Sequence, residues 1–173
     1  MNIKKLSISA ILTAFSIVIP MFFPKVIIPP FTATLMSHVP IMLAVCISTD
    51  IAIFVTVGTS IGFVFAFSAI PFGYLRSFTH VFFVLLACFM LKKTKNVYLT
   101  IVITGIVHSV LETAVIMFLF LPADVTPLYA MPILVLGAFI HHIIDAIFTS
   151  AVIYPLKKAK MIDRKFNLGK RIV

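Results

Sequence analysis

The sequence predicts an all-α integral membrane protein with six transmembrane helices and both termini in the cytoplasm. Of the 173 residues, 62% are hydrophobic and only 11% are charged, whereas about 25% of the residues in an average soluble domain are charged. The apolar residues form tracts close to the roughly 20 residues that a helix needs to cross a bilayer. The basic residues gather at the ends of these tracts. We expect a single transmembrane domain covering residues 1–173.

The first two predicted spans are joined by an extended connection. Leu6–Phe23 is a continuous apolar tract that ends at Pro24. The connection is rich in proline, which disfavours helix at the residue before it. The second tract, Ala33–Ile47, is shorter, and Pro40 inside it indicates a tilted or partly unwound helix.

Four longer tracts follow. Each is bounded by residues that end helices or stay in water, namely proline, glycine, aspartate or lysine. Asp50 is placed to cap the first of them. The four predicted spans are Ile51–Ala69, Tyr74–Leu91, Val97–Leu121 and Met131–Leu156.

The basic residues predict the orientation of this bundle. Twelve of the 14 Lys and Arg residues lie in three groups, with two at Lys4–Lys5, three within Lys92–Lys95 and seven within Lys157–Arg171. Six spans place all three groups on one side, and basic loops mark the cytoplasmic side of a membrane. The net charge of +9 therefore reflects topology. Nucleic acid is not expected as a partner, because the charges are not interleaved with polar, solvated structure.

Polar side chains within the predicted spans indicate a functional site, because they are costly in lipid. Most of them form three pairs at i, i+4, so the members of each pair share a helix face. The candidates are Arg76 with His80, His108 with Glu112, and His141 with Asp145, together with His38 and Tyr74. Counted from the outer ends at about 1.5 Å per residue, they lie in the outer half of the membrane. This asymmetry predicts a pocket that opens to the outside.

Each of these residues also has a structural interpretation. Arg76 can extend to the outer interface as an isolated charge. Glu112 and Asp145 can tie helices together through neighbouring histidines or arginine. His141 and His142 are about 100° apart on a helix, so they are not both expected to face the interior.

Three classes of function remain open on the residues alone. A histidine and a carboxylate one turn apart suit a divalent ion, which is consistent with a metal-uptake subunit. Arg76 beside them instead favours an organic anion. A self-sufficient proton- or cation-coupled carrier would use the same groups as a relay, although no inverted repeat is visible. The chain has no P-loop, nucleophile elbow or HExxH motif, so neither catalysis nor a cofactor is expected.

The whole pattern resembles the substrate-binding S-components of energy-coupling factor (ECF) vitamin transporters. These are also short six-helix chains with an outward pocket and basic cytoplasmic ends. Ala10-Ile11-Leu12-Thr13-Ala14 matches the Ala-xxx-Ala motif of that family. Ile28–Pro40 and Arg76–His80 are similar to the niacin-type S-components, and the pantothenate type is the nearest rival.

The resemblance implies a vitamin-binding subunit in the plasma membrane, without enzymatic activity. The loop Pro24–Ser37 would act as a lid over the pocket. Ala10 and Ala14 would pack against the transmembrane T-component, because small residues allow close approach of helices. Two cytoplasmic ATPases would supply the energy for transport.

For a pyridine carboxylate, the resemblance also suggests roles for the polar residues. Arg76 would bind the carboxylate with two parallel hydrogen bonds, and His80 or His38 would add a donor. Glu112 or Asp145, acting through a histidine, would hold the ring nitrogen or orient the arginine. The aromatic residues considered for stacking on the ring are Phe31, Tyr74 and Phe78.

Overall fold

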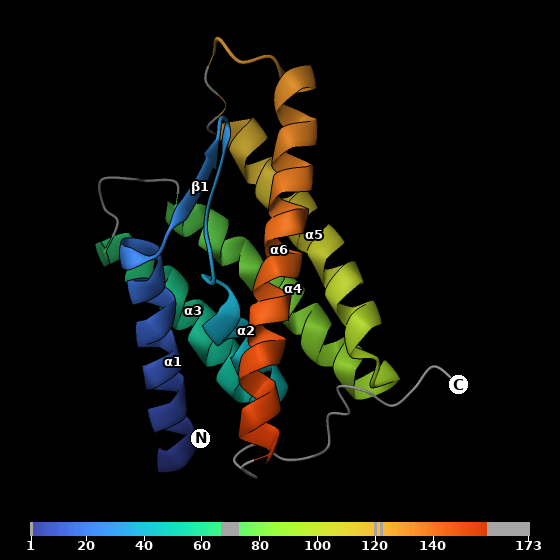
Figure 1. Cartoon of the computed structure of the whole chain (residues 1–173). Coiled ribbons are helices and arrows are strands. Elements are labelled where there is room, and N and C mark those ends of the chain that lie inside the picture. Colours follow the sequence, from blue (N-terminus) through green and yellow to red (C-terminus); the bar gives the residue numbers. More distant parts are fainter. Residues whose placement is uncertain (1, 67–72, 120, 122, 159–173) are drawn as a thin grey trace.

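The computed structural model describes residues 2–66, 73–119, 121 and 123–158, which form a helical bundle with a small β-hairpin (Figure 1). The hairpin was not expected in an all-α protein. In chain order, the elements are α1 (Ile3–Phe22), β1 (Lys25–Ile28), β2 (Phe31–Thr34), α2 (Val39–Ile47), α3 (Thr49–Ala66), α4 (Gly73–Thr94), α5 (Val97–Leu119) and α6 (Pro127–Lys158).

In the part of the chain that the structure describes, five of the six helices are long and apolar enough to cross a membrane, namely α1, α3, α4, α5 and α6. The second predicted span is wrong in its extent. Ala33 and Thr34 belong to β2, and α2 has only nine residues. Nine residues rise about 14 Å, which is less than half of a hydrocarbon core of about 30 Å. Pro40 lies in the first turn of α2, where proline is tolerated, and it did not mark a kink.

Three parts of the sequence prediction lie partly outside the described residues, and one of them is the fifth span, Val97–Leu121, in which residue 120 is not described. The third predicted span ends at Ala69, beyond the last described residue of α3. Most of the third basic group follows Lys158. The cytoplasmic placement of the two termini therefore stays a prediction.

The hairpin connects α1 to α2 and folds over the bundle. β1 and β2 pair antiparallel, with Lys25 opposite Thr34 and Ile28 opposite Phe31. The side chain of Phe31 is buried and packs on α6 at Gly137, where an added Cβ would lie only 2.8 Å from the ring. The hairpin is thus anchored to α6 by one aromatic side chain.

The short helix α2 lies inside the bundle, where it packs against α1, α3, α4 and α6. Its apolar residues join α3 and α4 in one buried cluster that includes Ile41, Val55 and Phe83. The glycines Gly58 and Gly62 of α3 face Thr13 and Ile17 of α1. The absence of side chains there allows the two helices to approach closely.

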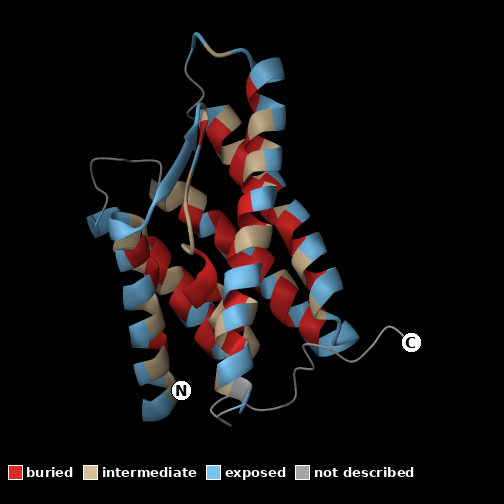
Figure 2. Cartoon of the chain, in the orientation of Figure 1, coloured by how far each residue is buried: buried red, intermediate tan, exposed pale blue. Residues whose placement is uncertain are grey.

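Exposed residues lie on the outer faces of the helices (Figure 2), and many of them are large and apolar. Phe15 on α1, Phe65 on α3 and Phe82 on α4 are each more than half exposed. Lipid is the environment in which such a surface is stable. The buried residues lie on the inner faces of the helices and include many polar side chains.

Candidate functional site

All five histidines of the chain meet around His38, the residue that precedes α2. The others come from α4, α5 and α6. The centroid of the His38 ring lies 4.7 Å from that of His80, 4.8 Å from His108, 4.7 Å from His141 and 6.5 Å from His142. Three long helices and the segment leading into α2 therefore contribute to one buried imidazole cluster.

Asp145 on α6 holds His38 and the turn before it. One carboxylate oxygen accepts a hydrogen bond from the backbone N–H of Met36 at 2.8 Å. The other accepts from the backbone N–H of His38 at 2.8 Å and faces Nδ1 of its ring at 3.1 Å. This buried carboxylate thus fixes the segment between β2 and α2, as expected for a structural tie.

Glu112 on α5 holds Arg76 on α4. Nε and Nη2 of Arg76 both donate to Oε1 of Glu112, the former at 2.6 Å. Nη2 also donates to the backbone carbonyl of Thr32 in β2 at 3.1 Å. The side chain of Arg76 is 24% exposed and that of Glu112 only 7%. The arginine therefore does not extend alone to the interface but joins two helices to the hairpin.

A cavity of about 200 Å³ lies between the hairpin and the imidazole cluster. Thr32, Ala33 and Thr34 of the hairpin form one wall, and Thr59 and Phe63 of α3 form part of another. Its charged and imidazole lining consists of Lys25, His38, Arg76, His80, Glu112 and His141. The described residues thus place two cationic side chains, one carboxylate and three imidazoles around the cavity.

Five of the eight predicted site residues line this cavity: Arg76, His80, His38, Glu112 and His141. His108 and Asp145 lie behind them, in contact with Glu112 and His38 respectively. Tyr74 is not among the lining residues. Of the aromatic side chains considered for stacking, Phe31 is buried against α6 and Phe78 is not in the lining, which instead contains Phe63.

The expectation that His141 and His142 would not both face the interior is wrong. Both are buried, with 6% and 1% of their surface exposed. His141 faces Ser37 at 3.2 Å, whereas the ring of His142 lies 5.4 Å from that of His108. The two directions are both interior because α6 is covered by α2 and β2 as well as by α5.

The sequence pattern did not assign Lys25 or the α3 residues to the site. Lys25 and Arg76 are the two basic residues outside the three groups at the ends of the predicted spans. This isolated position is the feature of the sequence that points to Lys25 as a site residue. Thr59 and Phe63 carry no charge in an apolar span, so nothing in the pattern distinguished them. Their position depends on how α3 packs, which follows from the tertiary structure.

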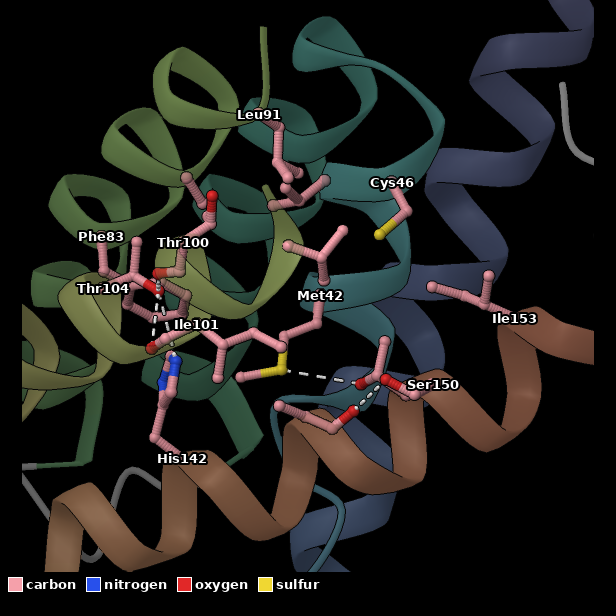
Figure 3. Close-up of a pocket in the computed structure, with 15 residues that line it drawn as sticks. Met42, Cys46, Phe83, Leu91, Thr100, Ile101, Thr104, His142, Ser150 and Ile153 are labelled. Carbon is pink, nitrogen blue, oxygen red and sulfur yellow. Dashed lines mark hydrogen bonds between the residues drawn. The ribbon is translucent and has the colours of Figure 1, made fainter. Parts of the chain in front are cut away.

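A second, smaller cavity of about 60 Å³ lies between α2, α4, α5 and α6 (Figure 3). Its lining is mostly apolar and includes Met42, Leu91 and Ile153. His142 reaches its edge and lies 3.4 Å from the hydroxyl of Thr104. Since no described residue of its lining carries a charged side chain, this lining does not suit an ionic ligand.

Comparison with known proteins gives one informative relative. No family model and no solved structure matches the chain. The chain is 32% identical to the niacin transporter NiaX of Lactococcus lactis subsp. cremoris (strain MG1363), in an alignment that covers 99% of this chain and 82% of NiaX. The match and the five long apolar helices identify a multi-pass transport protein of the plasma membrane. The chain therefore belongs to the family of NiaX, the niacin-type S-components of ECF transporters.

Proposed function

We propose that this chain is the niacin-binding S-component of an ECF-type importer and captures niacin in the cavity beneath the hairpin. Niacin is a pyridine ring with one carboxylate and is an anion at neutral pH. The observation that carries the proposal is that Arg76 and Lys25 meet in one cavity with three imidazoles. The similarity of the whole chain to a niacin transporter supports the same ligand.

Arg76 and Lys25 bind the carboxylate in this proposal. Glu112 already accepts hydrogen bonds from Nε and Nη2 of Arg76, so the ligand meets the rest of a guanidinium that is held in place. The paired hydrogen bonds expected from the resemblance would require Arg76 to give up either its bonds to Glu112 or the bond from Nη2 to the carbonyl of Thr32. Lys25 adds a second positive charge from the hairpin. A hydrogen bond to a charged group contributes about 1.5–3 kcal/mol, or about 10- to 100-fold in affinity.

The ring nitrogen of niacin points to the imidazole side of the cavity. His38, His80 and His141 form that side, and a neutral imidazole donates from one nitrogen and accepts at the other. Phe63 and Ile41 provide apolar surface for the ring. A bound niacin would thus have its charged end near Arg76 and Lys25 and its ring above the histidines.

Transport would require partners that bind the outside of α1. Ala10 and Ala14 are exposed on α1 in the isolated chain, where they permit close approach of a T-component helix. The chain has no nucleotide-binding motif, so the energy would come from two ATPases bound to that T-component.

Calorimetric titration of the purified chain in detergent tests the proposal with four ligands. Niacin is expected to bind more tightly than nicotinamide, which lacks the negative charge, and than benzoate, which lacks the ring nitrogen. It should also exceed pantothenate, a larger carboxylate. Equal binding of nicotinamide, or no binding of niacin, would contradict the proposal.

Two charge-removing variants test the roles of the cations. Arg76→Gln and Lys25→Gln are each expected to weaken niacin binding by about 10- to 100-fold. Lys93→Gln removes a charge from the end of α4 remote from the cavity, and it should bind niacin like the wild type. Wild-type affinity in Arg76→Gln would show that the carboxylate binds elsewhere.

A further inference from the structure

We propose that His38, His80 and His108 bind a divalent transition-metal ion, of the kind represented by Zn²⁺ or Co²⁺, at the floor of the niacin cavity. The proposal rests on these residues and not on niacin binding, so either can fail without the other. The ion would be a resident component of the binding subunit. This differs from a metal-uptake function, in which the ion itself is transported.

The positions of the ring nitrogens suit a metal ion. Each of the three residues offers one ligand atom, and the three atoms lie within 4.8 Å of one another. Nε2 of His38 lies 3.3 Å from Nε2 of His80. Two nitrogens at about 2.0–2.1 Å from a tetrahedral Zn²⁺ are about 3.3–3.4 Å apart. A hydrogen bond has a similar length, but it would join only these two rings.

The third ring lacks the partners that a buried imidazole needs. His108 is fully buried, and neither of its ring nitrogens has a hydrogen-bond partner among the described residues. Nε2 approaches Glu112 at 3.2 Å without hydrogen-bond geometry. Nδ1 of His80 is also buried without a partner in the described part of the chain. Since buried polar atoms are normally hydrogen-bonded, an ion that accepts nitrogen lone pairs would account for this cluster.

Asp145 orients His38 for metal binding. An ionised carboxylate only accepts hydrogen bonds, so the contact at 3.1 Å places a proton on Nδ1 of His38. The lone pair of Nε2 then points toward His80. Metal-binding histidines commonly donate their second N–H to a carboxylate in this way. The alternative group of His38, His141 and Asp145 is less suited, because Asp145 already accepts from two backbone amides.

The buried charges are also consistent with a cation. Asp145 and Glu112 provide two negative charges, and Arg76 is paired with Glu112. Paired in this way, the arginine repels a nearby ion less than an isolated one would. With a divalent ion added to Arg76 and the two carboxylates, these groups together would carry a net charge of about +1. A net positive charge suits an anionic vitamin. His38 and His80 line the cavity and His108 does not, so a fourth coordination position would face the cavity.

Cobalt titration of the chelator-treated full chain, in detergent and without niacin, tests the proposal. The wild type is expected to bind about one Co²⁺ with the strong visible absorption of a four-coordinate site. His80→Gln and His108→Gln should abolish that absorption. His142→Gln is the matched control, because His142 belongs to neither candidate group and should leave the absorption unchanged. Absence of Co²⁺ binding by the wild type would overturn the proposal.

His80→Cys keeps the proposal testable if the glutamine variants do not fold. A cysteine ligand at position 80 should add a sulfur-to-cobalt charge-transfer band that the wild type, which already has Cys46 and Cys88, does not show. Binding of Co²⁺ without that band would contradict the proposal. Loss of binding in His141→Gln together with retention in His108→Gln would move the ion to the alternative group and would also contradict it.

Discussion

Nε and Nη2 of Arg76 are engaged by the protein itself. They donate to Glu112, and Nη2 also reaches the carbonyl of Thr32, whereas Nη1 makes no hydrogen bond among the described residues. Arg76 therefore ties the hairpin to the helices, and one end of its guanidinium is left for the proposed ligand. Glu112 determines where that end points.

Glu112→Gln should change the apo protein and the complex differently. The variant leaves the charge of Arg76 without its buried partner, which is expected to lower the stability of the vitamin-free protein by about 1–3 kcal/mol. Bound niacin would replace the lost negative charge, so the gain in melting temperature on adding niacin should exceed that of the wild type. Thermal unfolding with and without niacin measures both effects.

Asp124→Asn is the control for this substitution, because it removes a carboxylate that is exposed. It should alter neither the melting temperature nor the shift caused by niacin. A smaller niacin shift in Glu112→Gln than in the wild type would show that Glu112 holds the vitamin rather than the arginine.

The candidate residues could be predicted from the sequence because helical periodicity is local. Spacing of i, i+4 places both members of a pair on one face, and a charged residue in an apolar span is itself conspicuous. Each of the three predicted pairs contributes one histidine to the imidazole cluster. Arg76 and Glu112, which come from two of these pairs, are in direct contact. Lys25 could not be assigned in the same way, since its place in the cavity depends on the fold of the hairpin.

The hairpin is the element on which closure of the cavity depends. Thr32, Ala33 and Thr34 form a wall of the cavity, and Phe31 anchors the same strand to α6 at Gly137. The expected lid over Pro24–Ser37 corresponds in position to this hairpin. Its motion stays a prediction.

Gly137→Ala is expected to displace the hairpin. The added methyl would lie 2.8 Å from the ring of Phe31, and such overpacking typically costs about 1–3 kcal/mol. Weaker niacin binding should accompany the lower melting temperature. Combining the substitution with Phe31→Leu should recover part of both losses, because the smaller side chain makes room.

A change at an exposed position of the same helix provides the comparison. Leu136→Ala alters a side chain that is 59% exposed, and it should leave niacin affinity unchanged. If Gly137→Ala bound niacin as tightly as the wild type, the anchor would not control the cavity.

The number of helices was predictable, but the shortness of α2 was not. Apolar composition alone cannot separate a span from a short buried helix, because both read as continuous hydrophobic tracts. The predicted span is longer than α2 because it includes Ala33 and Thr34, which pair with β1 instead of extending the helix. That pairing requires the preceding chain to turn back at Pro29 and Pro30.

On the scale of the whole molecule, the proposed ligand site and the expected partner surface are well separated. The cavity lies inside the bundle beneath the hairpin, whereas Ala10 and Ala14 are exposed on the outside of α1. Binding of niacin and assembly with partners should therefore be affected by different substitutions.

Ala14→Leu is expected to prevent assembly without affecting the vitamin. The larger side chain would hold a T-component helix away from α1, while the cavity is unchanged. Calorimetry on the isolated chain should show wild-type niacin affinity, and co-purification with a T-component and uptake into vesicles should both be lost. Ala151→Leu, a matched change at an exposed position of α6, should preserve all three. Niacin uptake by vesicles that contain this chain alone would contradict the need for partners.

Gly58 and Gly62 of α3 influence more than the distance between two helices. Thr13 meets the space above Gly58, and a Cβ on Gly62 would overlap the side chain of Ile17. Thr13 and Ile17 fit against the two glycines only at one rotation of α1 about its own axis. The glycines therefore also determine the direction in which Ala10 and Ala14 face. A methyl group added inside the bundle would rotate α1 and turn those alanines away from a partner. Coupling to the energy source could thus be lost through a residue that touches neither the vitamin nor the partner.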